Sequence, residues 1–228
     1  LDSDDLNALQ SNQFAALSST QVASLTSDQI GTLQSDDVRA ISSAGLRAWS
    51  TDQLAALSET NMGALTTAQV ASLTTAQVSS LVTDDLNALG TAQFAALTTA
   101  QVTALTGAQV GGLVSDDLRA MTTAQFGAMS SVQIGGLTAD QIPNLESADL
   151  RAINTAALRT MTSDQLDALS GTQMAQLTTG QVAALTTAQL SNLGSDDLNA
   201  LSSSQFSALS STQVASLTSD QIGTLQSD

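Results

Sequence analysis

The chain of 228 residues has 21 acidic and five basic side chains, a net charge of −16, and no histidine or cysteine. Nucleic acids and anionic membrane surfaces attract positive charge, so we expect neither as a partner. The chain also lacks an imidazole base, a thiol nucleophile and the usual ligands of zinc, haem and iron–sulfur clusters. We therefore expect no cofactor and no enzymatic activity, and the short apolar runs predict no membrane insertion.

A large apolar residue occurs at every eighth position from Leu1 to Leu225. Numbered from this residue, 28 complete octads run from Leu1 to Thr224, followed by four further residues, and position 6 is always apolar as well. Unbroken periodicity of this kind is typical of repeat proteins in which each unit contacts its neighbours. We expect one continuous array over residues 1–228, as a segment of a longer chain.

Each octad carries the signals of one short helix. Position 3 is Ser or Thr in 24 of the 28 octads, and these residues are favoured helix N-caps. Of the 19 Asp, 17 lie at positions 4 and 5, near the positive end of a helix dipole, and all five Arg lie at position 7, toward its negative end. The pattern predicts a helix over positions 4 to 9. A second register, with the cap at position 2 and a Thr-x-x-Gln capping box, fits the sequence too.

Two other conformations account less well for the octad. In one continuous helix, eight residues advance by about 800°, so the apolar stripe would rotate by about 80° in each octad. A β-strand needs apolar residues at a period of two, and Ala, Gln and Asp are weak strand formers. The expected fold class is therefore all-α, a solenoid of very short helices that stacking stabilises. A β-solenoid is the alternative.

Longer periods indicate how many octads form one coil. In chain order, Asp-rich octads contain the pairs that begin at Asp4, Asp36, Asp84 and Asp116, then Asp149, and then the pair that begins at Asp196. The intervals between these octads are 32, 48, 32, 32 and 48 residues, always an even number of octads. Phe and Met at position 6 also fall only in even-numbered octads. This parity predicts two octads, 16 residues, per coil.

The Asp pairs are candidate metal ligands, because calcium prefers carboxylate oxygens. No EF-hand loop and no Gly-Gly-x-Gly-x-Asp repeat accompanies them, and their place at helix starts also fits a purely structural role. Calcium therefore stays one hypothesis beside the structural interpretation. The candidate residues are Asp4, Asp5, Asp36, Asp37, Asp84, Asp85, Asp116, Asp117, Asp196 and Asp197.

Three other features have both a functional and a structural interpretation. Rows of Ser and Thr would suit the binding of ice or polysaccharide, but helix capping uses the same hydroxyls. The Arg residues at position 7 either pair with carboxylates of neighbouring coils or lie in solvent. Pro143, at position 7, is the one proline, and because it lacks an N–H we expect an irregular helix there.

The segments Leu65–Leu73 and Leu177–Leu185 are both close to Leu-Thr-Thr-Ala-Gln-Val-Ala-Ala-Leu. They resemble the octapeptide-repeat regions of large secreted or surface proteins of Gram-negative bacteria, of the adhesin or extracellular-filament type. The resemblance covers the whole chain and implies an extracellular or cell-surface structural protein, part of a fibre, stalk or matrix. It carries over no catalytic or binding residue.

We therefore expect a structural repeat protein that forms a rod or filament. The apolar ends of a stacked array favour self-association end to end. The alternative is a surface adhesin or binding module that holds a glycan, ice or a protein on its Ser/Thr-rich face.

Overall fold

The computed structural model describes residues 3–225, with side chains from Asp5 onward. This part of the chain contains 27 short α-helices, one 3-10 helix and no strand. Each octad forms one helix, so the predicted all-α solenoid of short helices is confirmed and the β-solenoid is not supported. Among the described residues, no helix combines the length and the apolar character needed to cross a membrane.

The helices begin one residue earlier than the main prediction. Helix α9 spans Thr67–Ser72, and the N-cap is Thr66 at position 2, whose hydroxyl accepts from the backbone N–H of Gln69. The Gln69 side chain accepts from the N–H of Thr66 at 2.7 Å. The capping box needs Gln three residues after the cap. Gln lies at position 5, three residues after position 2, whereas the residue three after position 3 is the apolar residue at position 6. The register with the cap at position 2 is therefore correct, and the cap at position 3 is wrong.

Helices of six residues, such as α9, end at the apolar residue that opens the next octad, whereas shorter helices, such as those capped by Ala16 and Ala55, end one or two residues earlier. The C-cap of α9 is Leu73, with φ −55° and ψ 147°, and its N–H donates to the carbonyl of Val70 at 3.1 Å. The next residue, Thr74, is also extended and caps the following helix. No residue in the described part of the chain has a positive φ. Two extended residues therefore make this corner, without the left-handed conformation that requires glycine.

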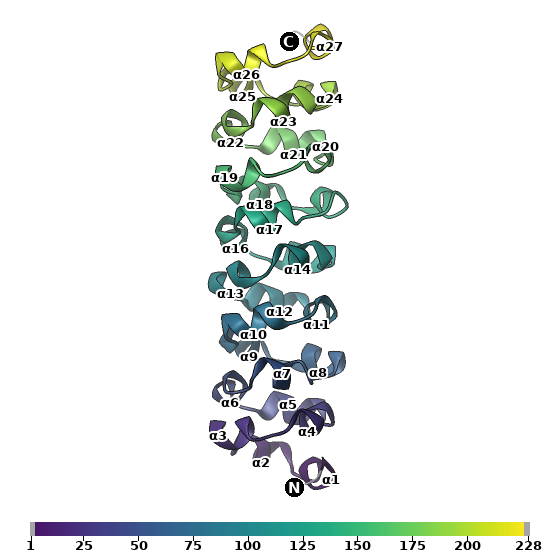
Figure 1. The fold of residues 1–228 in the computed structure, drawn as a ribbon, viewed down its shortest axis with the longest axis vertical. Coiled ribbons are helices and arrows are strands. Elements are labelled where there is room, and N and C mark those ends of the chain that lie inside the picture. The colour runs from purple at the N-terminus through teal and green to yellow at the C-terminus, as the bar shows by residue number, and fades with distance from the viewer. Residues whose placement is uncertain (1–2, 226–228) are drawn as a thin grey trace. The chain divides into compact units, whose positions relative to one another are not determined.

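The chain forms two compact units, one of Leu1–Leu105 with Gly112–Met121 and one of Thr106–Gly111 with Thr122–Asp228. Within each unit, helices whose first residues lie 24 residues apart pack side by side, as do α3 (Ser19–Ala23) and α6 (Ser43–Arg47) in Figure 1. One coil therefore contains three octads, and the predicted coil of two octads is wrong.

The first unit contains three columns of stacked helices. The first column is α1 (Ser3–Asn7), α4 (Ser27–Gly31), α7 (Thr51–Leu54), α10 (Thr75–Ser80) and α13 (Thr99–Ala104). The second is α2 (Ser11–Ala15), α5 (Ser35–Ala40), α8 (Glu59–Ala64) and α11 (Thr83–Ala88). The third is α3, α6, α9, α12 (Thr91–Ala96) and α15 (Ser115–Ala120).

The second unit repeats this arrangement. One column is α16 (Thr123–Ala128), α18 (Ser147–Ala152), α21 (Gly171–Gln176), α24 (Ser195–Asn199) and α27 (Ser219–Thr224). Another is α14 (Gly107–Gly112), α17 (Ser131–Gly135), α19 (Thr155–Leu158), α22 (Thr179–Ala184) and α25 (Ser203–Ser207). The remaining octads form η1 (Ile142–Asn144), α20 (Ser163–Asp167), α23 (Thr187–Asn192) and α26 (Ser211–Ala215).

The even spacing of the Asp-rich octads does not indicate how many octads form one coil. In the first unit alone, the helices α1, α5 and α15 begin such octads and belong to three different columns. An interval of four octads moves a sequence feature to the next column, because a coil closes after three. The sequence period and the structural period are therefore independent.

Positions 1 and 6 form the core of each coil. Away from the first and last coils, the position-6 side chains are at most 1% exposed, and Phe94 and Phe126 are completely buried. The residues at position 1, from Leu33 to Leu201, are buried as well. Burial of these two side chains in each octad supplies the stability that a helix of six residues lacks by itself.

The irregular helix expected at Pro143 is confirmed. Residues 139–141 form a turn, and η1 replaces the α-helix of this octad. A helix would need an N–H at Pro143 to bond to the carbonyl of Ala139, and proline has none. The side chain of Gln141 nevertheless donates to the carbonyl of Val110 at 3.0 Å, so this octad keeps its contact with the coil before it.

Candidate functional site

The most regular polar feature of the coil-to-coil interface is a buried Gln at position 5. Gln101 is 2% exposed, and its Nε2 donates to the carbonyl oxygens of Val70 and Leu73, both at 2.8 Å. Its Oε1 accepts from the N–H of Thr98 at 2.7 Å. One side chain thus caps the start of its own helix and the carbonyl end of a helix in the preceding coil, where both sets of backbone groups lack helical partners.

The same bonds recur in both units, most often to residues 31 and 28 positions earlier, whereas Gln53, Gln93, Gln165 and Gln213 bond to residues 30 and 28 positions earlier. The Gln residues that make both bonds include Gln69, Gln77, Gln173, Gln181, Gln189, Gln205 and Gln221. The sequence predicts a capping box for this Gln but not its second contact, with the preceding coil. The signal was available in principle, because a side chain with two donor hydrogens recurs beside the core position 6 in most octads.

Where Gln is absent, another side chain supplies the donor. At Ala157, the amide of Asn154 donates instead to the carbonyl of Met129 at 3.1 Å. In the octad of Trp49, where Gln53 donates to the carbonyls of Ala23 and Leu25, the indole of Trp49 adds a donor to the backbone carbonyl of Val22 at 3.0 Å. The carbonyl end of the preceding coil thus receives a donor by more than one route, as buried backbone groups require.

Asp occupies the Gln position in the Asp-rich octads. The structure separates the two members of the pair at Asp36: the side chain of Asp36 is 82% exposed, whereas Asp37 is 4% exposed. The pairs at Asp84 and Asp116 follow the same pattern. A carboxylate has no hydrogen to donate, so these octads lack the amide bond to the preceding coil.

The Asp pairs do not converge into a ligand set. Asp196 is exposed and Asp197 is half-buried, Asp5 is exposed, and the side chain of Asp4 lies outside the described residues. No group of three or more His, Cys, Asp or Glu side chains that could hold a metal ion occurs in the part of the chain that the structure describes. Calcium binding stays a prediction, which isothermal titration with calcium would test.

Burial, with a smaller contribution from the neighbouring Asp116 carboxylate, raises the pKa of Asp117 to about 6. The Oδ2 atom of Asp117 is buried without a hydrogen-bond partner. Burial also raises the pKa of Asp85, with smaller contributions from Glu59 and Asp84, while a backbone hydrogen bond at Val82 opposes the shift.

Three further position-5 carboxyls show the same effect of burial. The pKa of Asp149 is raised by burial, although the Thr123 hydroxyl donates to its carboxylate at 3.1 Å and opposes the shift. Burial raises the pKa of Asp37 and of Asp197 as well. These carboxyls bind a proton more readily than free Asp.

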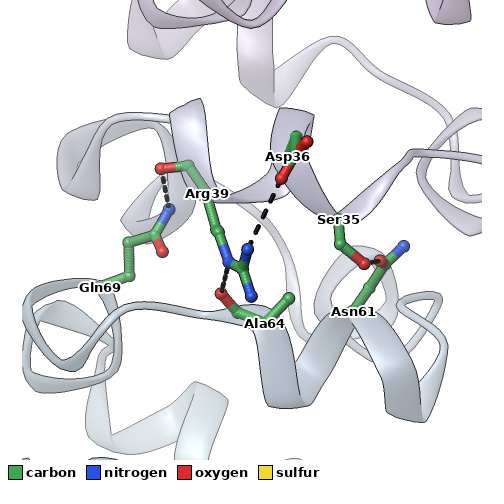
Figure 2. A network of polar contacts seen from close by, with 6 residues as sticks. All are labelled: Ser35, Asp36, Arg39, Asn61, Ala64 and Gln69. Carbon is green, nitrogen blue, oxygen red and sulfur yellow. Dashed lines mark hydrogen bonds and ion pairs between the residues drawn. The ribbon is translucent and has the colours of Figure 1, made fainter.

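The Asp-rich octads carry a compensating donor at position 7. Arg39 donates from Nε to the carbonyl of Ala64 in the next coil at 3.2 Å, and its guanidinium lies 3.5 Å from the Asp36 carboxylate (Figure 2). Figure 2 also shows Ser35 donating to Asn61 at 2.8 Å. Position 7 is Asn or Arg in all six of these octads. The octads of Arg39, Asn87 and Asn199 replace a donor to the preceding coil by a donor to the following one.

Asn87 shows the second form of this contact. Its Nδ2 donates to the carbonyl of Gly112 at 3.0 Å, and its Oδ1 accepts from the N–H of Val114 at 3.1 Å. One amide thus bonds to both sides of the corner in the coil that follows. Asn199 likewise donates to the carbonyl of Thr224 at 3.1 Å.

Glycine permits the closest approach of two coils in the second unit. A Cβ atom on Gly136 would overlap the backbone of Gly107, and a Cβ on Gly111 would lie 2.5 Å from the carbonyl oxygen of Gly136. These backbones therefore touch at positions where any side chain would separate them.

A shallow, open hollow lies on the second unit. It is lined by Thr123, Ala148, Arg151, Ala152 and Thr178. It brings together one cation, two hydroxyls and no carboxylate, so it offers no paired acid and base.

A family model described as the ALTTAQ repeat matches the chain six times, over residues 1–35, 30–67, 80–115, 110–145, 142–179 and 191–227. The six letters correspond to Ala64–Gln69 in this sequence. That segment contains the core Leu65, the N-cap Thr66 and the interface Gln69, so the motif matches the elements that build and join the coils. No curated protein matches the chain.

Proposed function

The chain belongs to the ALTTAQ repeat family, and from this premise we propose that it is a structural repeat segment whose coils stack into a rod or filament. The observation that carries the proposal is the bond from the buried Gln amide to backbone carbonyls of the preceding coil, as in Gln101. Every residue has a carbonyl, so this contact depends little on the sequence of the neighbouring coil. A contact of that kind suits an array that is extended by adding similar coils.

The proposal excludes catalysis for a chemical reason. Each carboxylate environment recurs in several octads, whereas an active site needs one convergence of different groups. Asp117, whose pKa is raised to about 6, is buried and its Oδ2 atom has no hydrogen-bond partner, and the hollow near Arg151 contains no carboxylate.

We place the segment at the cell surface or in the extracellular matrix. The support is the resemblance of Leu65–Leu73 and Leu177–Leu185 to repeat regions of secreted and surface proteins of Gram-negative bacteria. A chain without cysteine needs no particular redox environment for such a location.

A length series tests the structural function. We would insert a second copy of residues 65–88, which is one coil of three octads, after Ala88, and compare both proteins by small-angle X-ray scattering and electron microscopy. We expect the longest dimension to grow by a fixed increment for each added coil at constant cross-section. A particle that grows equally in all directions would contradict the proposal. Unchanged circular dichroism per residue serves as the control for folding.

A binding module is the second candidate, and exposed hydroxyls favour it. Thr67 in α9 and Thr91 in α12 are both exposed and belong to adjacent coils of one column. Such a row would present hydroxyls at a regular spacing to a glycan or to ice. Binding on a glycan array, or thermal hysteresis that Thr67→Val and Thr91→Val abolish, would support this candidate over the purely structural one.

A further inference from the structure

The backbone carbonyls at position 1 show how firmly neighbouring coils are joined. A residue at position 1 lies just after a helix, so its carbonyl has no partner within that helix. In the first unit, six of these carbonyls accept from a side-chain amide of the following coil, 28 residues later in each case: those of Leu25, Leu33, Ile41, Trp49, Leu65 and Leu73. This bond is the regular polar contact between the coils of this unit.

Two residues of the same series lack the bond. The residue 28 positions after Leu57 is Asp85, and the residue 28 positions after Leu89 is Asp117. A carboxylate has no hydrogen to donate. Leu57 and Leu89 are 4% and 2% exposed, and among the described residues neither carbonyl accepts a side-chain amide of the following coil. These two buried corners therefore lack the donor that the other corners of the series have.

The carboxyl group of Asp117 is unpaired as well. Asp117 is 3% exposed, and its Oδ2 atom is buried without a hydrogen-bond partner. Asn61, whose side chain has the same length and shape, donates from position 5 to the carbonyl of Leu33 at 2.7 Å. By the same register, the Asp117 carboxylate and the Leu89 carbonyl are two acceptors at a place that other coils fill with one donor and one acceptor.

The charged groups around Asp117 do not replace the missing donor. Helix α12, which packs against α15, contains no titratable side chain, and α11, which precedes the Leu89 corner, contributes only the acidic Asp84 and Asp85. On α15 itself, Arg119 is exposed and forms no ion pair with Asp117 within the described part of the chain. Burial and, to a smaller extent, the exposed Asp116 carboxylate raise the pKa of Asp117. The ionised form is therefore disfavoured at this contact.

We propose that the contact between α12 and α15 is a joint, a place where the stack opens locally while the coils on either side stay closed, and that a donor hydrogen on the Asp117 side chain closes it. An ionised carboxylate leaves the joint free to open. A proton taken up from solvent by Oδ2, or an amide in place of the carboxyl, supplies one hydrogen bond to the carbonyl oxygen of Leu89. The two coils are then joined as Asn61 joins its own coil to the one before. The array thus contains a conformational device that responds to acidity, which goes beyond the proposed structural function.

The same device recurs in both units. In the first unit, Asp85 takes this place, and burial followed by the Glu59 carboxylate of the preceding coil raises its pKa. In the second unit, Asp197 takes this place 28 residues after Leu169, and burial followed by the Asp167 carboxylate raises its pKa. Joints therefore separate groups of coils that Gln amides hold together.

Hydrogen–deuterium exchange tests the joint by comparing helices within one protein. At neutral pH, we expect the backbone amides of α15 to be protected about tenfold less than those of α13, whose Gln101 makes both bonds to the preceding coil. Asp117→Asn should raise the protection of α15 by about tenfold and leave that of α11 unchanged. Asp116→Asn is the matched control, because it removes the same charge from an exposed neighbour and should leave α15 unchanged.

The reverse substitution should create a joint. Gln101→Glu keeps an acceptor oxygen for its capping box but has no hydrogen to donate, so we expect α13 to lose about tenfold of its protection at neutral pH. At about pH 5, after correction for the intrinsic exchange rate, α15 of the unaltered chain should approach the protection that Asp117→Asn shows. Its protection should thus rise on acidification more than that of the variant.

The joint is overturned if α15 of the unaltered chain is as protected as α13 at neutral pH, or if Asp116→Asn protects α15 as much as Asp117→Asn does. Protection of α15 that falls on acidification would also contradict it. All variants should retain the circular dichroism of the parent, and an equal shift in every helix would count against a local opening. None of these results alters the expected length increment per coil, so the proposed structural function is tested separately.

Discussion

The amide nitrogen of Gln101 donates to the carbonyl oxygen of Leu73 across 2.8 Å, from one coil to the coil before it. Leu73 is the C-cap of its helix, so its carbonyl has no partner within that helix. The bond therefore satisfies a buried backbone group and joins two coils at once. Loss of such a side chain leaves backbone groups unpaired at an interface that excludes water.

Replacement of this glutamine gives the first prediction. We expect Gln101→Ala to lower the free energy of unfolding by about 3 kcal/mol, because two carbonyls and one N–H lose their partner. The matched control is Gln34→Ala, since Gln34 is an exposed Gln without a side-chain cap bond. It should change stability by less than about 0.5 kcal/mol. Urea unfolding followed by circular dichroism measures both, and equal effects would contradict the double-capping role.

Acidification should stabilise the protein. The pKa of Asp117 rises from an ordinary 3.8 to about 6 in the folded chain, so folding increases proton affinity. Its stabilising contribution is fully present below 3.8 and is lost as the pH rises through about 6. The raised pKa values of Asp37, Asp85, Asp149 and Asp197 act in the same direction. We expect the melting temperature to fall between pH 4 and pH 7, about the range of these shifts.

Asp117→Asn isolates this effect. An amide at position 5 has hydrogens to donate at any pH and need not take up a proton first. Asn61, for example, donates to the carbonyl of Leu33 at 2.7 Å. We expect Asp117→Asn to raise stability at pH 7 by about 1 kcal/mol and to flatten the pH dependence. Asp116→Asn is the control, because Asp116 is exposed. A steeper pH dependence in Asp117→Asn would show that its carboxylate is favoured by folding.

The close approach of coils at glycine is tested by a pair of substitutions in the second unit. We expect Gly136→Ala to destabilise the protein by about 1–3 kcal/mol, because the new Cβ would overlap the backbone of Gly107. Gly180→Ala should instead stabilise it by about 0.5–1 kcal/mol, since Gly180 is an exposed helical residue and its Cβ would meet only Thr178 Oγ1, at 3.9 Å. Thermal unfolding compares the two, and the same sign for both would refute the close contact.

Replacement of Asn154 tests whether different side chains supply the same bond. Asn154→Ala should cost about 2 kcal/mol, because Ala157 loses its cap and Met129 its donor. Adding Ala157→Gln to this variant restores the amide in the position that other octads use. We expect the double variant to recover part of the loss in urea unfolding. A double variant that is less stable to urea than Asn154→Ala would mean that the two positions are not equivalent.

Much of the local structure could be predicted from the sequence. The eight-residue period, with Ser or Thr at position 3 and Asp at positions 4 and 5, indicated one capped helix per octad. The structure contains one helix in each octad. The irregularity at Pro143 followed from its missing N–H. These features depend on neighbours within a few residues, which the sequence displays directly.

The size of the coil could not be predicted in the same way. It depends on the angle through which two extended residues, such as Leu73 and Thr74, turn the chain between helices. Composition does not reveal this angle, and the Asp-rich octads recur at even numbers of octads, whereas a coil contains three. The interface role of Gln101 was hidden for a related reason, because its acceptors lie 28 and 31 residues away.

The three columns of helices have a genetic consequence. Each octad offers the same carbonyls to the coil after it, so an octad can occupy any column, and the Asp-rich octads of the first unit occupy all three. Unequal crossing-over that adds or deletes a single octad would move every later helix to the next column, yet each Gln would again face a helix end. Alleles of such a gene can thus differ in length by steps of eight residues and keep the Gln contacts between coils, whereas close contacts such as that of Gly107 with Gly136 would lose their matching partner.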